Sequence, residues 1–273
     1  MNDVVIASSA ADASAATAVE QHHAQLAGSL ALRVEGLVAA AASRNDAVAE
    51  RARTELDTWC RTELMPHALA EEKAMYPAAQ ARPEGRLLVE GMLGEHAVIT
   101  GLVDEVARTT DPVRAAVAAR ALQTLFESHL AKENDLVLPV LVAAPEVSLA
   151  EILHGMHELL GADTGSGHES GHESGHESAA VESGCGGHTC SCGESEGAGF
   201  PELDARAVPH AIRHATIFGA LDAVRPGDGM VLVAPHDPLP LLAQIEQRAP
   251  GVFEVDYLER GPEAWRLAFV RTA

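Results

Sequence analysis

His67-Ala-Leu-Ala-Glu71, followed by Pro77, and His129-Leu-Ala-Lys-Glu133, followed by Pro139, are two copies of one pattern, His-x3-Glu-x5-Pro. Both copies lie in stretches whose apolar residues recur at helical spacing. Four residues turn a helix by roughly 400°, so the His and Glu of each copy stack on one face, about 6 Å apart along the axis. Each pair can therefore ligate one metal ion while its carboxylate reaches a second.

Two other predicted helices, over residues 14–43 and 83–108, each place one histidine on their apolar face. These are His23 and His96, and an apolar residue follows each of them three positions later. The chain thus repeats the order His, then His-x3-Glu, twice. Four long amphipathic helices joined by short turns predict an up-down four-helix bundle.

Prolines and capping residues set the expected limits of the other helices. A helix from about residue 45 to 75 contains Pro66, which predicts a kink, and Pro77 is expected to end it. The next helix begins after Asp111 as N-cap, and Pro139 is expected to close it. A short fifth helix follows Ser148.

The inward-facing ionisable residues are the first candidate site. A single inward histidine is more often a hydrogen-bonded core residue than a ligand. Four imidazoles and two carboxylates in one dry core would instead leave unpaired charge, at a cost of several kcal/mol per ion, which a metal removes. Their nitrogen and oxygen donors suit iron or manganese better than structural zinc. The predicted ligands are His23, His67, Glu71, His96, His129 and Glu133.

On these motifs, residues 14–160 resemble a hemerythrin-like (HHE cation-binding) domain. The resemblance implies a non-haem centre of two iron ions with an oxo or hydroxo bridge, held by the six residues above. Oxygen-carrying members have one more histidine and an aspartate where this chain has Thr100 and Asn134. The resemblance therefore implies reaction with, or sensing of, dioxygen, peroxide or nitric oxide rather than simple oxygen carriage. Candidates for the missing ligand or for a supporting role are His22, Glu72, Tyr76 and Glu95.

Residues 161–199 predict a flexible acidic linker between two domains, and residues 1–13 a disordered N-terminus. The linker contains three tandem copies of Gly-His-Glu-Ser and no Lys or Arg, so it lacks the apolar residues of a core. Near its end lie three soft sulfur ligands and an imidazole: Cys185, His188, Cys190 and Cys192. They form a candidate auxiliary metal site. The alternative is that the segment is a solvated acidic linker that binds no metal.

Residues 200–273 predict a small two-layer domain with the order βαβαββ. The segment resembles an uncharacterised bacterial domain found beside hemerythrin-like domains, and its element order is similar to the SirA/TusA-like sulfur-carrier fold. Where those carriers have Cys-Pro, this chain has Pro209-His210, which excludes persulfide transfer there. His210, His236 and Asp237 form a candidate ligand site, with a helix N-cap as the alternative role of Asp237.

Composition restricts the classes of function. The net charge of −21 and the 3% of aromatic residues disfavour nucleic acid as a partner. No stretch is apolar enough for a membrane span, so we expect a cytoplasmic protein. The expected partners are a small gaseous or peroxide ligand and a protein that docks on the C-terminal domain. Three functions remain open: an oxidoreductase, a sensor, and a metal-handling protein that stores or donates iron with the linker as an auxiliary site.

Overall fold

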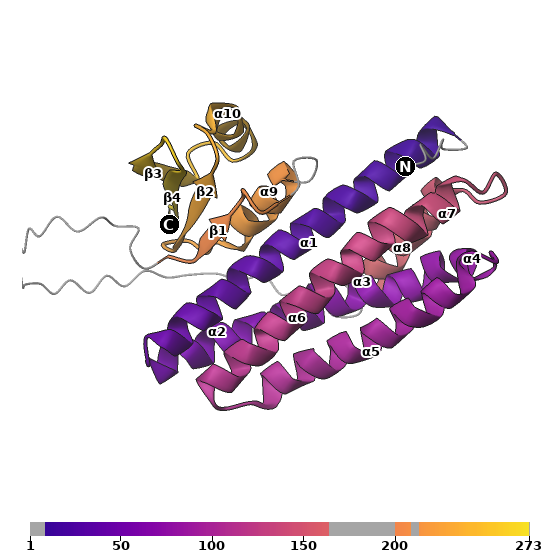
Figure 1. Cartoon of the computed structure of the whole chain (residues 1–273), viewed down its shortest axis with the longest axis horizontal. Helices are drawn as coiled ribbons and strands as arrows, with labels where there is room; N and C mark the ends of the chain where they lie inside the picture. The colour runs from indigo at the N-terminus through magenta and orange to yellow at the C-terminus, as the bar shows by residue number, and fades with distance from the viewer. Residues whose placement is uncertain (1–8, 164–199, 209–212, 273) are drawn as a thin grey trace, which may run out of the picture.

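The computed structural model describes residues 9–163, 200–208 and 213–272. The N-terminal part is an up-down bundle of four long helices, and the C-terminal part is a small sheet with two helices, as predicted (Figure 1). The helical segments of the bundle are α1 (Ala10–Ala42), α2 (Asp46–Trp59), α3 (Met65–Ala70), α4 (Tyr76–Gln80), α5 (Arg86–Arg108), α6 (Pro112–Lys132), α7 (Leu138–Val142) and α8 (Leu149–Asp163).

Side-chain caps explain where several of these helices begin. Ser9 Oγ accepts a hydrogen bond from the backbone N–H of Asp12, so α1 begins at Ala10, before the expected start at residue 14. The expectation of disorder over residues 1–13 is therefore wrong for residues 10–13. Asp111 caps α6 through the N–H groups of Val113 and Arg114, as predicted.

Two of the four long helices do not end where their prolines suggested. A π-helical turn precedes each of three prolines: Cys60–Leu64 before Pro66, Glu71–Met75 before Pro77, and Glu133–Val137 before Pro139. In each case the residue before the proline donates its N–H to the carbonyl five residues back.

Proline lacks an N–H and its ring collides with the carbonyl four residues earlier. We attribute the continued helices to the extra residue of the π turn, which gives the ring room. The helix thus runs past Pro77 to Gln80 and past Pro139 to Val142, so the expected ends were wrong. Such turns are frequent at functional sites, and two of these three begin at the glutamates of the repeated motif.

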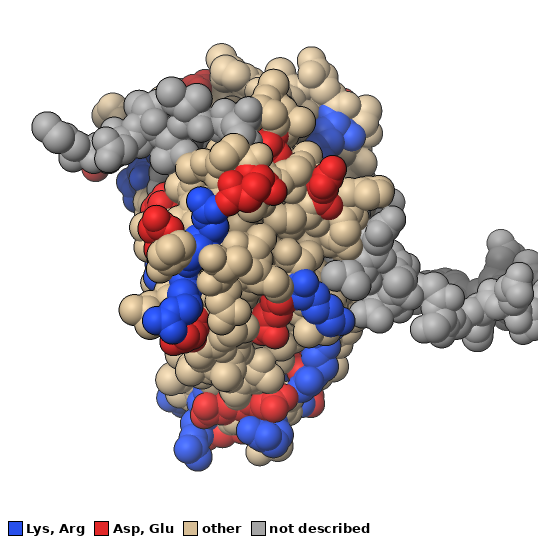
Figure 2. Space-filling model, turned by 90° about the vertical axis from the view of Figure 1, so that its right-hand side faces the viewer, with Lys and Arg blue, Asp and Glu red and all other residues tan. Residues whose placement is uncertain are grey.

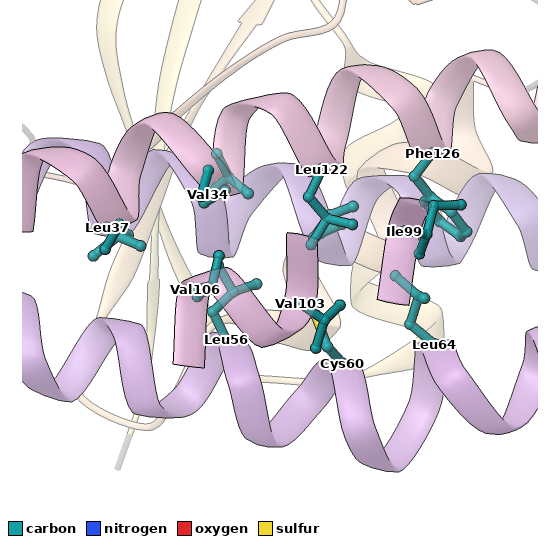
Figure 3. Packing of buried hydrophobic residues seen from close by; sticks show 14 of the residues in the cluster. Val34, Leu37, Leu56, Cys60, Leu64, Ile99, Val103, Val106, Leu122 and Phe126 are labelled. Carbon is teal, nitrogen blue, oxygen red and sulfur yellow. The ribbon is translucent and has the colours of Figure 1, made fainter. Parts of the chain in front are cut away.

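Two apolar clusters form the core of the bundle, one on each side of the inward histidines. Figure 3 shows the larger cluster, to which all four long helices contribute. Along α1, His23 lies between Val19 of one cluster and Leu26 of the other. On α5, Met92 and Ile99 belong to these same two clusters in the same order. The inward histidines therefore form a polar layer enclosed by apolar side chains.

The C-terminal part contains a four-stranded mixed sheet in the order β1-β2-β4-β3. β1 is parallel to β2, and the other neighbours are antiparallel. Every residue of β2 is buried, whereas β3 alternates between partly buried and exposed residues, as its sequence predicts. The elements, in the predicted order, are β1 (Glu202–Asp204), α9 (Arg213–Ala223), β2 (Gly229–Ala234), α10 (Leu239–Arg248), β3 (Phe253–Arg260) and β4 (Trp265–Arg271).

The two parts meet where α9 packs along α1 (Figure 1). A Cβ atom added to Gly28 would lie 2.0 Å from the backbone oxygen of Thr216, and one added to Gly219 would lie 2.2 Å from that of Gln25. The hydroxyl of Ser29 donates to the carbonyl of Gly219 at 2.7 Å. Two glycines thus let the backbones approach closely, and α1 belongs to the bundle and to the domain interface at once.

Charged side chains of both signs are mixed on one face of the described structure. Figure 2 shows acidic and basic residues interspersed on the face that it presents, rather than a continuous basic patch. None of the helices in the described part of the chain combines the length and the apolar character needed to cross a bilayer.

Candidate metal centre

The structure brings the six predicted ligands together in the polar layer of the bundle. α1 carries His23, α5 carries His96, and the two motif copies contribute the other four from α3, α6 and the first residues of the two π turns. All six side chains are at most 5% exposed: His23, His67, Glu71, His96, His129 and Glu133.

His23, His67 and Glu71 form a first group whose ligand atoms all lie within 4.8 Å of one another. The Oε1 atom of Glu71 is 2.8 Å from His67 Nε2 and 3.2 Å from His23 Nε2. Two imidazole nitrogens and one carboxylate oxygen therefore converge on one point from two helices.

His96 and His129 form a second group with the same glutamate, also within 4.8 Å. Their Nε2 atoms are 3.0 Å apart, and the Oε2 atom of Glu71 is 3.8 Å from His96 Nε2. Glu71 thus directs one oxygen to each group, which is how a carboxylate bridges two metal ions.

Glu133 lies between the two groups. Its Oε2 atom is 3.8 Å from His23 Nε2 and 3.7 Å from His129 Nε2. Its Oε1 atom accepts a hydrogen bond of 2.7 Å from the hydroxyl of Tyr76. That hydroxyl is also 3.3 Å from His96 Nε2, so Tyr76 reaches the second group.

Buried polar atoms without partners test whether a metal fits here. Within the described part of the chain, His67 Nδ1, His67 Nε2 and Glu133 Oε2 are buried and make no hydrogen bond. An unpartnered buried polar group costs about 1–3 kcal/mol. Two of these atoms point into the centre: His67 Nε2, which is 2.8 Å from Glu71 Oε1 without hydrogen-bond geometry, and Glu133 Oε2. A cation there would bind both, so the residues fit a metal.

Acceptors behind three of the imidazoles orient them. The Nδ1–H groups of His23, His96 and His129 donate to Asn134 Oδ1 at 2.8 Å, Glu72 Oε1 at 2.7 Å and Glu95 Oε2 at 3.0 Å respectively. A proton held on Nδ1 leaves the lone pair on Nε2, the atom that faces the centre. His67 lacks such an acceptor among the described residues.

The four candidates for the missing ligand thus occupy different places. Only Tyr76 directs its polar atom into the centre, because Glu72 and Glu95 lie behind the imidazoles. His22 contacts the ring of His67 edge-on, with centroids 5.0 Å apart. The sequence marks Asn134 only as a departure from the oxygen carriers and does not predict its contact with His23. Its place beside Glu133 was the available signal.

The two glutamates differ in electrostatics although their motifs match. Burial on its own raises the pKa of Glu71, but the imidazoles of His67 and His23 bring it well below its ordinary value. Burial and the charge of Glu71 raise the pKa of Glu133 well above its ordinary value. Burial also lowers the pKa of His129 to about 4, with His96 adding to the effect.

A groove on the surface of the bundle has His96 of the second group in its wall. Its volume is about 530 Å³, and it lies between α3 and α5 with His96 and Thr100 in its wall. Leu69 and Leu93 contribute apolar surface beside Glu72. Thr100 donates its hydroxyl to the backbone of His96 and faces this groove. The groove thus borders the outer side of His96, where Glu72 lies.

The other predicted sites lie apart from the centre or outside the described residues. Asp237 does not cap α10, because Pro238 occupies the cap position and Asp237 accepts a hydrogen bond from Tyr257 at 2.7 Å. His236 is exposed, and its ring lies 3.4 Å from the backbone oxygen of Asp237. His210 and the linker residues Cys185, His188, Cys190 and Cys192 lie outside the described residues.

Comparisons with protein families agree with this arrangement. Residues 14–141 match the Hemerythrin HHE cation binding domain, and residues 202–271 match a family described as Uncharacterized conserved protein (DUF2249). Searches of curated proteins and of solved structures find no match to the chain. The chain therefore carries a hemerythrin-like cation-binding domain followed by a second, smaller domain.

Proposed function

With the hemerythrin-like domain as premise, we propose that the bundle holds two iron ions and reacts with hydrogen peroxide or dioxygen. The observation that carries this proposal is the shared carboxylate: two groups of ligands meet at opposite oxygens of Glu71. Each group has two imidazoles, and the two motif copies supply one to each. In two-metal sites of proteins, the two ions are typically about 3.5–4 Å apart.

The donor set supports iron. Imidazole and carboxylate suit iron and manganese, whereas structural zinc sites are closed tetrahedral sets rich in cysteine. The described cysteine, Cys60, lies in the apolar core, where burial raises its pKa to about 12, so its thiol is a poor ligand. When bound, a pair of iron ions supplies one- and two-electron redox chemistry toward peroxide, dioxygen and nitric oxide.

The chain's own residues would orient the ligands and control protons. Asn134, Glu72 and Glu95 keep three Nε2 atoms available by holding the protons on Nδ1. Tyr76 retains its proton because burial and the neighbouring Glu133 raise its pKa, and it donates that proton in a hydrogen bond to Glu133. Thr100 occupies the sequence position of the further histidine in the oxygen carriers that the domain resembles, and it lines the groove beside His96.

A second candidate function is sensing, and the position of α1 favours it. α1 carries His23 and also packs against α9 of the C-terminal domain through Gly28 and Ser29. A change in ligation at His23 would thus reach the interface through one helix. Metal handling by the linker stays a prediction, because its residues lie outside those described.

Anaerobic loading of the full-length protein with Fe(II), followed by peroxide, tests the proposal. We expect two iron ions per chain and a change in the near-ultraviolet absorption on adding peroxide. His67→Ala should lose iron from the first group, and the exposed His236→Ala should match the wild type. Iron content near zero, or a spectrum that peroxide leaves unchanged, would contradict the proposal.

Sensing has its own test. Limited proteolysis of the iron-loaded protein should change when nitric oxide is added, and the change should be lost in His23→Ala. An identical cleavage pattern with and without the gas would exclude sensing but leave the redox proposal standing.

A further inference from the structure

We propose a second ligand site, distinct from the metal centre, in which Arg33 binds a small organic carboxylate in a cavity between the bundle and the C-terminal domain. The cavity has a volume of about 370 Å³. α1 and α2 form one wall, with Arg33 and Trp59, and Pro201, Val224 and Arg225 of the C-terminal part form the other. Pockets at domain interfaces are frequent ligand sites.

The Arg33 guanidinium is the strongest indication of a ligand. Among the described residues it has a single hydrogen-bond acceptor, the backbone oxygen of Ser29 at 3.0 Å, and no carboxylate within ion-pair distance. A guanidinium carries five N–H donors, so most of its donors have no acceptor among these residues. Burial lowers the pKa of Arg33 to about 10, with the nearby Arg225 adding to the effect. A partly buried cation without a counter-charge favours the binding of an anion.

The walls of the cavity indicate what kind of anion fits. The guanidinium carbon of Arg33 lies 4.9 Å from the centre of the Trp59 ring, which holds the cation against an aromatic face. Leu32, Pro201 and Val224 add apolar surface beside it. A ligand with an apolar body and one charged end would contact both kinds of wall.

The charged side chains that line the cavity favour a carboxylate over a phosphate dianion. The other arginine of the cavity, Arg225, is already paired with Glu55, and Asp228 adds a further negative charge to the lining. Arg33 is therefore the arginine of the cavity without a carboxylate at ion-pair distance among the described residues. One negative charge matches it better than two, because Asp228 already adds negative charge to the lining. Guanidinium and carboxylate also form paired, parallel hydrogen bonds.

Calorimetric titration of the full-length protein with sodium benzoate tests this site. We expect one benzoate per chain with a Kd of about 1 mM or lower, and no binding of benzamide, which has the same shape without the charge. Inorganic phosphate should bind more weakly than benzoate. Binding should change the fluorescence of Trp59, so the signal should survive in Trp265→Phe and vanish in Trp59→Phe.

Variants of Arg33 decide whether this residue receives the carboxylate. Arg33→Gln should weaken benzoate binding at least tenfold, and Arg33→Lys should weaken it less because the charge remains. Arg86→Gln, at an exposed arginine of α5, should bind as the wild type does. If Arg33→Gln does not fold, the benzoate affinity of Arg33→Lys is the test. An affinity of Arg33→Lys equal to that of the wild type then overturns the proposal. The absence of benzoate binding to the wild type, or equal binding of benzamide, also overturns it.

Discussion

The two His-x3-Glu copies have the same sequence pattern and the same local helix, but their glutamates have different surroundings. Each glutamate begins a π turn and stands one turn after its histidine. Glu71 faces imidazoles of both groups. Glu133 faces Tyr76 on one oxygen, and its other oxygen lies 3.7–3.8 Å from one imidazole of each group without a hydrogen bond to any described residue.

This difference shows that a ligand motif fixes which residues point inward but not what each one does. The pKa of Glu71 is low because the imidazoles of His67 and His23 outweigh its burial, and the pKa of Glu133 is high because burial and the charge of Glu71 act together. The residues that make the copies unequal come from other helices or from outside the motif, such as His23 and Tyr76.

The largest effect is expected from Glu71→Gln. Because both groups share this carboxylate, the substitution should remove both iron ions, while the matched exposed substitution Glu105→Gln on α5 should keep them. Iron analysis of the purified variants measures this directly. A variant that retained one ion at wild-type affinity would show that Glu71 is not shared.

Glu133→Gln should have a smaller effect. Its Oε2 atom is 3.8 Å from His23 Nε2, whereas Glu71 Oε1 is 3.2 Å from the same nitrogen, so at least one ion should remain in the first group. The comparison with Glu71→Gln in the same iron assay is the test. Equal loss in the two variants would mean that the glutamates are equivalent and that their different surroundings have no consequence.

Substituting an acceptor behind one of the imidazoles should weaken iron binding in one group only. Loss of an outer acceptor typically weakens metal binding about 10–100-fold. Glu95→Gln should act on the second group through His129, and Asn134→Ala on the first through His23. Competition with a chelator during iron removal separates the two ions. If either variant weakened both ions equally, the outer acceptors would not act separately.

The smallest effect is expected from Tyr76→Phe. The change removes one hydrogen bond to the Glu133 carboxyl, which is worth about 1–3 kcal/mol, and leaves the ring packed in the apolar cluster. Thermal unfolding should show the loss of stability, with iron content close to that of the wild type. Loss of an iron ion in this variant would instead identify Tyr76 as a required ligand.

The sequence predicts the bundle well because helical periodicity is local. The spacing of His23 from Leu26, and of each motif histidine from its glutamate, is enough to place these residues on inward faces. The element order of the second domain was likewise predicted, since its strands are short apolar runs between turn residues. The helix ends at Pro77 and Pro139 were wrong, because a π turn accommodates a proline that would otherwise stop the helix.

Other features depend on packing between distant segments. His23 and Asn134 are 111 residues apart, and their contact follows from how α1 lies beside the last helix of the bundle. The sharing of Glu71 likewise depends on how four helices converge. Gly28 gives no local signal that α9 will pack against it, and the Arg33 cavity exists only because the two domains meet.

In the proposed centre, two iron ions share the Glu71 carboxylate. Anomalous diffraction at the iron edge, from crystals of the iron-loaded full-length protein, tests it most directly. We predict two iron peaks about 3.5–4 Å apart, one beside His23 and His67 and the other beside His96 and His129, with Glu71 between them. A single peak, or two peaks of which only one lies next to Glu71, would contradict the claim.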